Sequence, residues 1–435
     1  MKKTLLGTTA LVSAGLVAQN AQAADPIELS IGGFQTWGFY TTDVDDSAKT
    51  DPGFGTDNHD LFYSGELLFS GKTVLDNGLE VGLRFELEGE TSGDQLDETY
   101  VYVEGAFGTL RIGNDDDVAA QLGTAAPYLS YIFGANSPTV FANGISNFMS
   151  RSVEGAVAAN PGFTAPAGGL TIDKVTTNAA NGAMRELTVT VPEDTVVVPA
   201  TPAKAGATPG GALKSRFAAG ATSTLSTFAA YGGDRGRIMY FTPVFNGFQF
   251  GVSYSPNAGE TGNGGTYELP EDTDTASVSV AGNYNGQLGD VGVTFSAGYV
   301  NIDADNGNDT VMWNTGLSLS MDNWSIGGSY QDVSDQGNVE GTDSQTFDVG
   351  VSYTSDGPWA VGIYWLNAEV DYAKGNLHAD RGVTDEFDIY RLQGRYTLGP
   401  GINLHGAVGL DTIDDGVINT DYDSTFVGGA LAVSF

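Results

Sequence analysis

Charged side chains recur at every second position in several stretches of this sequence. The clearest stretch runs from Leu79 to Glu88, where every odd position is apolar and nearly every even position is charged, as at Arg84 and Glu86. A period of two places alternate side chains on opposite faces of a β-strand, so these charges share one face. Opposite charges facing each other across a narrow aqueous passage would sort solutes by charge and polarity. If these strands enclose an aqueous passage, the pattern therefore predicts selection of solutes by charge rather than catalysis.

Parity along each strand identifies the remaining basic candidates. The candidate basic wall contains Lys72, Arg84, Arg111, Arg235, Arg237, Arg391 and Arg395. The candidate acidic partners are Glu86, Glu88, Asp115, Asp116 and Asp117. Among the basic residues, Arg84 is the first candidate for the narrowest point, judged from its distance to the turns.

The run of Asp115, Asp116 and Asp117 has a second interpretation. Carboxylate oxygens are hard ligands that suit Ca²⁺, so this run is also a candidate calcium site. Three adjacent acids without the spacing of an EF-hand loop are more often a solvated bend. Both interpretations remain open, and the sequence indicates no other cofactor.

Three histidines are the main candidates for acid-base catalysis. His59 and His378 fall in two separate long connections, and His405 lies near a short turn on an inward-facing position. A hydrolase needs a nucleophile or an activated water beside a base, and no serine or carboxylate motif accompanies these histidines. The sequence therefore favours a non-enzymatic protein, with a hydrolase as a remote alternative.

Composition narrows the class of protein further. The 435 residues include 54 Asp and Glu against 18 Lys and Arg, which is the wrong sign for binding phosphate backbones of nucleic acids. Residues 1–23 have a positive start, an apolar stretch and the small residues Ala21 and Ala23 near their end, as in a cleaved export signal. Cysteine is absent, so no disulfide is expected in the exported chain, which we predict to be a single domain over residues 24–435.

The alternation extends along the whole mature chain. It recurs, for example, in Phe248 to Tyr254, Phe347 to Tyr353 and Ile402 to Leu410. Short and long connections alternate between such stretches and define sixteen strands, an even number as closure of an antiparallel barrel requires. In lipid, the backbone N–H and C=O groups at the edges of a sheet have no water to bond, so the strands must close into a ring. A ring of sixteen strands leaves an aqueous channel. We therefore predict an all-β, sixteen-stranded antiparallel transmembrane barrel.

One connection, over residues 114–234, is far longer than the others. Ordered loops of this length usually carry function. Its first part contains an aromatic run that would anchor it against the inner wall: Tyr128, Tyr131, Phe133, Phe141 and Phe148. Its second part, residues 154–227, is an insert rich in Ala, Pro, Gly and Thr, in which Leu170 to Thr176 and Glu186 to Val191 are predicted to pair as a hairpin.

Several segments resemble the general bacterial porins of the non-enteric type. They are Asp97 to Gly105 followed by Phe107 to Gly113, Met239 to Pro243, the Asn283-Tyr284 pair, and the terminal Phe435 after alternating residues. The resemblance implies a sixteen-stranded barrel that forms trimers, acts as a molecular sieve and folds its long third loop inward. The Pro-Glu-Phe-Gly-Gly-Asp motif of the enteric porin loop is not found.

These expectations combine into a functional hypothesis. We expect a pore in the outer membrane for passive diffusion of small hydrophilic solutes and ions, with mild cation preference; a substrate-selective channel for sugars or anions is the alternative. The expected partners are copies of the same chain, membrane lipid and lipopolysaccharide, to which divalent ions on the loop acids could bridge. Aromatic residues near strand ends would form girdles at the two interfaces: Trp37, Tyr40, Trp313, Trp324, Trp359 and Trp365.

Overall fold

The structure is a computed structural model. It describes residues 26–44, 59–88, 96–130, 133, 171–177, 185–190, 227, 235–256, 276–303, 308–336, 340–372, 382–415 and 420–435. The predicted export signal lies outside these residues. Within the described ranges, no helix is long and apolar enough to cross a membrane.

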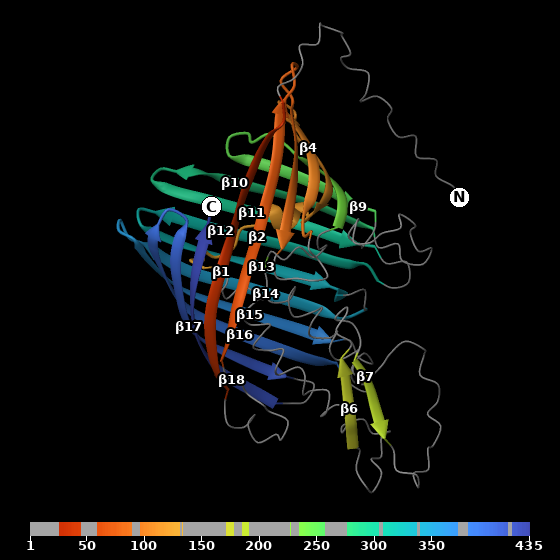
Figure 1. The fold of residues 1–435 in the computed structure, drawn as a ribbon, viewed down its shortest axis with the longest axis vertical. Coiled ribbons are helices and arrows are strands. Elements are labelled where there is room, and N and C mark those ends of the chain that lie inside the picture. The colour runs from red at the N-terminus through yellow and green to blue at the C-terminus, as the bar shows by residue number, and fades with distance from the viewer. Residues whose placement is uncertain are drawn as a thin grey trace, which may run out of the picture.

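Sixteen antiparallel strands form a closed barrel (Figure 1), which confirms the predicted fold class. The barrel strands are β1 (Glu28–Val44), β2 (His59–Val74), β3 (Glu80–Glu88), β4 (Thr99–Gly105), β5 (Gly108–Asp115), β8 (Arg235–Phe241), β9 (Phe248–Ser255), β10 (Ser277–Leu288), β11 (Val291–Ile302), β12 (Thr310–Met321), β13 (Trp324–Ser334), β14 (Asp343–Thr354), β15 (Trp359–Tyr372), β16 (Val383–Gly399), β17 (Ile402–Asp415) and β18 (Thr420–Ser434). Each pairs with its neighbours in chain order, and β5 pairs with β8.

Tight turns connect the strands at the predicted short side. The turn between β8 and β9 contains Asn246 at φ 50° and Gly247 at φ 88°. Asp322, between β12 and β13, has φ 51°. Positive φ at these positions matches the twist of the flanking strands, and Asn, Asp and Gly adopt it at low cost. Local turn chemistry therefore fixes the register of these hairpins.

The first and last strands close the ring. β1 pairs with β18 from Phe34 opposite Ser434 to Val44 opposite Ser424. The seam ends at the C-terminus, where Gly33 N donates to Phe435 O at 3.1 Å and Phe435 N donates to Gly33 O at 3.0 Å. No edge strand is left in the barrel, as a bilayer requires.

The outer face of the barrel is apolar. Ile363 is 62% exposed and Leu392 is 53% exposed, although both are large aliphatic residues. Aromatic pairs lie near both ends of the strands, with ring centroids 5.0 Å apart for Trp313 and Tyr330 and 4.9 Å apart for Trp324 and Tyr353. This arrangement is typical of a barrel whose outside faces lipid between two aromatic girdles.

Tyr40 corrects the girdle prediction. It is only 6% exposed and belongs to an apolar cluster inside the barrel. The reason is strand parity, because Tyr40 occupies an even position of β1, whereas the odd positions Trp37 and Phe39 point outward at 51% and 46% exposure.

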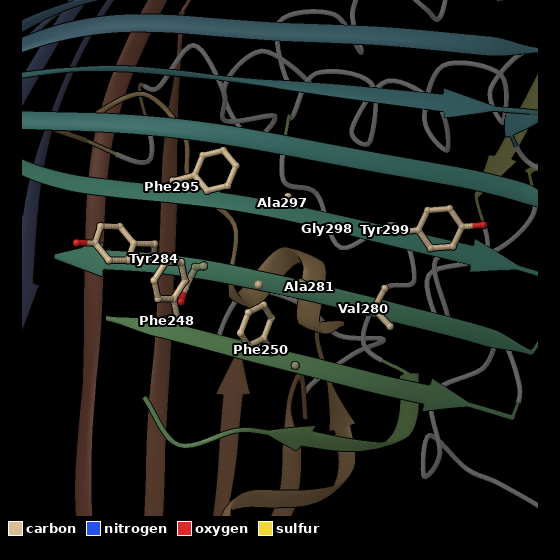
Figure 2. Close-up of a pocket in the computed structure, with 12 residues that line it drawn as sticks. Phe248, Phe250, Val280, Ala281, Tyr284, Phe295, Ala297, Gly298 and Tyr299 are labelled. Carbon is tan, nitrogen blue, oxygen red and sulfur yellow. The ribbon is translucent and has the colours of Figure 1, made fainter. Parts of the chain in front are cut away.

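A shallow hollow of about 560 Å³ lies on this outer face over β9, β10 and β11. Gly282 and Ala297 leave space between larger side chains such as Phe250 and Phe295. Figure 2 shows Tyr284 and Tyr299 at its two ends, with their hydroxyl groups pointing away from each other. The hollow is thus a feature of the outside of the barrel, separate from the interior where the polar residues lie.

The insert contributes a separate two-stranded sheet. β6 (Thr171–Thr177) pairs antiparallel with β7 (Arg185–Thr190). The predicted hairpin between these segments is therefore confirmed, with a register shift between Ile172 and Lys174.

Candidate functional site

The connection after β5 enters the barrel through one short helix. Asp117 caps this helix, α2 (Val118–Gln121), by accepting hydrogen bonds from Ala119 N at 2.8 Å and Ala120 N at 3.1 Å. Val118, Ala119 and Leu122 then pack against inward side chains of β8 and β10 to β13: Met239, Phe241, Ala281, Val300, Ile302, Met312 and Val333. We call residues 116–130 the inner segment. Its first part is held by an apolar contact with the inner wall.

Hydrogen bonds attach the second part of the inner segment to β14, β15 and β16. The carboxylate of Asp348 accepts from Ala126 N at 3.2 Å and from the Tyr128 hydroxyl. The side-chain oxygen of Gln393 accepts from Leu129 N at 3.1 Å and Ser130 N at 3.2 Å. Because these backbone N–H groups are buried, each acceptor removes a substantial desolvation cost.

Aromatic packing holds the chain again at Phe133. Its ring lies 5.6 Å from that of Phe62 on β2 and 5.7 Å from that of Phe426 on β18. The described part of the connection therefore contacts the inner faces of β8 and β10 to β13, then β14 and β16, and then β18 and β2. Tyr128 and Phe133 anchor it as predicted, whereas Tyr131, Phe141 and Phe148 lie outside the described residues.

Close approach of the inner segment depends on glycine in the wall. A Cβ atom at Gly298 would come 2.7 Å from the Cβ of Ala119, and one at Gly316 would collide with the carbonyl of Thr124. These positions have no room for a larger residue unless the inner segment moves. The barrel and the segment are thus fitted to each other, and the segment occupies part of the channel cross-section.

Charged residues of both signs line the inside of β2 and β3. Lys72 Nζ lies 3.0 Å from Glu80 Oε2 near the short-turn end, where Tyr102 also donates to Glu80 at 2.8 Å. Further along β3, Arg84 pairs with Glu86, whose side chain is largely buried. Arg84 and Glu86, one basic and one acidic candidate, therefore lie on the same strand rather than facing each other across the lumen.

Arg111 joins this charged wall to the inner segment. Its guanidinium lies 3.2 Å from Asp115 Oδ2 and donates to the side chain of Gln121 at 3.0 Å. The guanidinium also lies 5.0 Å from the ring centroid of Tyr100 and 4.9 Å from that of Phe241. Such a stacked and paired arginine positions the start of the inner segment.

Three carboxylates gather where β3 ends at Glu88, opposite the middle of β2. One oxygen each from Glu66, Glu88 and Asp97 lies within 4.8 Å of the others, a spacing that cations favour. Glu88 was a sequence candidate, but Glu66 and Asp97 were missed. Glu66 shares the parity of Lys72 on β2, so the parity rule could have identified it, although alternation is weak around Gly65 and Leu67. Its position opposite Glu88 becomes visible only in the structure.

The remaining basic candidates differ in their surroundings. Arg391 is 3% exposed in its side chain, pairs with Asp411 and lies 4.8 Å from the ring centroid of Phe426. Arg237 is also buried, and its Nε donates to the carbonyl of Arg235 at 3.3 Å. Arg395 is half-buried on the inward face of β16, directly across the ladder from His405.

The acidic run after β5 is engaged by the protein. Asp115 pairs with Arg111, the carbonyl of Asp116 accepts from Gln121 at 2.7 Å, and Asp117 caps α2. The second carboxylate oxygen of Asp117 is buried with no hydrogen-bond partner among the described residues. Calcium at this run stays a prediction.

The two described histidines lie on opposite faces of the wall. His59 is exposed on the outer face, where its ring centroid lies 6.1 Å from that of Phe39, whereas His405 faces the lumen. His378 lies outside the described residues. His59 and His405 are therefore not parts of one catalytic group.

A closed ring of sixteen strands with an apolar outside, polar residues inside and a chain segment along its inner wall defines an outer-membrane channel. Comparison with family models agrees with this class. The model described as Gram-negative porin matches residues 7–190 and 187–416, so the chain belongs to the Gram-negative porin family. The members of this family are non-enzymatic channels of the outer membrane.

Solved structures share the fold at low sequence identity. The anion-selective porin of Comamonas acidovorans has a TM-score of 0.51 and 12% identity, over 94% of this chain and all of that one. The outer membrane channel DcaP of Acinetobacter baumannii has a TM-score of 0.53 and 12% identity, over 94% and 97% of the two chains. OmpT of Vibrio cholerae, in its trimer form, has a TM-score of 0.50 and 10% identity, over 94% and 99%. Comparison with curated protein sequences finds no match.

Proposed function

We propose that this porin conducts small hydrophilic solutes and ions by passive diffusion, with a mild preference for cations. The observation that carries the proposal is the cluster of Glu66, Glu88 and Asp97 on the lumen face. The formal net charge of −36 adds a long-range attraction for cations. In addition, the positive charges of Arg84 and Arg391 are each paired with a carboxylate, which reduces their attraction for anions.

Reversal potentials in a potassium chloride gradient test this proposal. The purified full-length chain, inserted into planar bilayers, is expected to conduct ohmically and to show a modest excess of potassium over chloride permeability. A clear chloride preference would contradict the selectivity. A current that saturates with one sugar or one organic anion would favour the substrate-selective alternative instead.

We further propose that the channel works as a homotrimer in contact with lipopolysaccharide. The trimer form described for OmpT, which shares the fold, supports this assembly. Outward-facing acids such as Glu369 and Asp371 near the long-loop end of β15 suit bridging of divalent cations to lipid phosphates. Native mass spectrometry from detergent tests the assembly, since a mass of one chain under all conditions would refute it.

A further inference from the structure

The inner face near the short-turn end of β16 and β17 carries one basic patch. Arg395 lies four residues before the end of β16 at Gly399, and His405 lies opposite it three residues after the start of β17 at Ile402. The parity of Gln393, which is buried against the inner segment, places both side chains on the lumen side. The patch therefore lies next to the channel mouth on the short-turn side.

The strand register shows that no carboxylate adjoins this patch. In the ladder, Arg395 is opposite Ala360 on β15, and His405 is opposite Ala430 on β18. The next inward positions along β16 and β17 are Gln393, Thr397, Asn403 and Ala407. Arg395 makes no hydrogen bond or ion pair with any residue that the structure describes, in contrast to Arg84, Arg111 and Arg391.

The neighbouring polar groups are occupied or neutral. Thr397 donates to the side-chain oxygen of Asn403 at 2.8 Å, and Gln393 is bonded to the inner segment. The Nδ1 atom of His405 is buried and has no hydrogen-bond partner in the described part of the chain. The guanidinium thus has several N–H donors without protein acceptors. It lies beside an imidazole whose Nε2, the ring nitrogen that is not buried, can carry one more N–H donor.

The position of the patch gives these donors a role. Gln393, which accepts hydrogen bonds from Leu129 N and Ser130 N, is the inward-facing residue next to Arg395 on β16. A solute that passes the inner segment on this side next meets Arg395. Guanidinium groups bind carboxylate and phosphate oxygens in a bidentate manner, more strongly than they hold chloride in water.

We infer that Arg395 and His405 form a binding site for small oxyanions on the short-turn side of the inner segment. This inference rests on the proposed function as an open diffusion channel. Carboxylate and phosphate groups of solutes would bind at this site, in a channel whose total charge favours cations. The site also sets the residual anion permeability of the pore.

Bilayer recordings on two matched variants of the full-length chain test the inference. Arg395→Gln and Lys72→Gln each remove one positive charge from the lumen near the same channel mouth, but Lys72 is already paired with Glu80. The ratio of chloride to potassium permeability is expected to fall about twofold in Arg395→Gln and to change little in Lys72→Gln. Equal changes in the two variants would overturn the inference, because they would show an effect of total charge alone.

Inorganic phosphate supplies the second measurement. Phosphate added on the short-turn side should reduce the potassium chloride current of the unmodified protein more than that of Arg395→Gln. Arg395→Lys keeps the charge but loses the planar fork, so it should retain chloride permeability and lose part of the phosphate effect. Equal phosphate inhibition in all three proteins would overturn the inference. Absence of channels in the unmodified protein would instead contradict the proposed function.

Discussion

Two parts of the inner wall differ in kind. On β2 to β5 the lumen face carries charged residues in close pairs, including Arg84 with Glu86 and Arg111 with Asp115. On β10 to β13 the lumen face carries serine, threonine, asparagine, glutamine, glycine and a few apolar residues, with no charged side chain among those described. The uncharged part, together with β14 to β16, holds the inner segment. The close charge pairs of β2 to β5 and most anchors of the inner segment therefore involve different residues, although β16 carries both the anchor Gln393 and the basic Arg395. Ion preference and channel width are thus separable by mutation.

The largest expected effect comes from releasing the inner segment. The double variant Asp348→Ala and Gln393→Ala removes the acceptors of Ala126, Leu129 and Ser130. Hydrogen bonds to charged groups contribute about 1.5–3 kcal/mol each, and neutral ones about 1 kcal/mol. We expect the segment to leave the wall, with larger and noisier single-channel conductance and unchanged ion preference. Asp332→Ala, which removes an outward carboxylate on β13, is the control. A conductance of the double variant equal to that of the control would show that these hydrogen bonds do not determine the channel width.

A lysine on either face of β12 tests the assignment of inside and outside. Leu317 is 44% exposed on the outer face, and Ser318 follows it on the lumen face. A lysine at the bilayer midplane costs about 2–4 kcal/mol, whereas a lysine in the lumen is tolerated. Leu317→Lys should lower the free energy of unfolding in lipid by about that amount, measured by urea titration of refolded protein, and Ser318→Lys should not. Equal losses would contradict the parity of β12.

Neutralising the acidic cluster should change selectivity without changing width. In the triple variant Glu66→Gln, Glu88→Gln and Asp97→Asn, the potassium to chloride permeability ratio is expected to fall roughly two- to fivefold, since single charge interactions near water contribute about 0.2–1 kcal/mol. Conductance in symmetric high salt should stay close to that of the unmodified protein. Glu369→Gln, on the outer face, is the matched control. An unchanged potassium to chloride permeability ratio in the triple variant would show that the cluster does not select ions.

The smallest expected effect concerns the helix cap. Asp117→Ala removes the acceptor of Ala119 N and Ala120 N, and loss of such a cap costs about 1 kcal/mol. Hydrogen exchange at these two amides should become about fivefold faster, with little change at the amides of β10. Asp116→Ala serves as the control. Unchanged exchange in Asp117→Ala would mean that packing of Val118 alone holds the helix.

Strand parity accounts for what the sequence could predict. The alternation around Arg84 and the turn at Asn246 and Gly247 are local signals, so strand number, closure and the lumen face could be derived from them. The anchors of the inner segment could not. Asp348 meets Ala126 across 222 positions, and Gln393 meets Leu129 across 264, so neither contact leaves a local pattern. The same limit applies to the ion pair of Arg391 with Asp411, because parity identified Arg391 as an inward basic residue but gave no partner for it.

The seam between β1 and β18 has a consequence for biogenesis. Because β1 and β18 pair with each other, the backbone contacts at Gly33 and Phe435 form only when both of these strands are present. A product truncated before β18 would expose two unpaired edges, each row of orphaned N–H and C=O groups being costly in hydrocarbon. The barrel can therefore close only when β18 pairs with β1, and a chain that lacks β18 should be degraded rather than form an incomplete pore in the membrane.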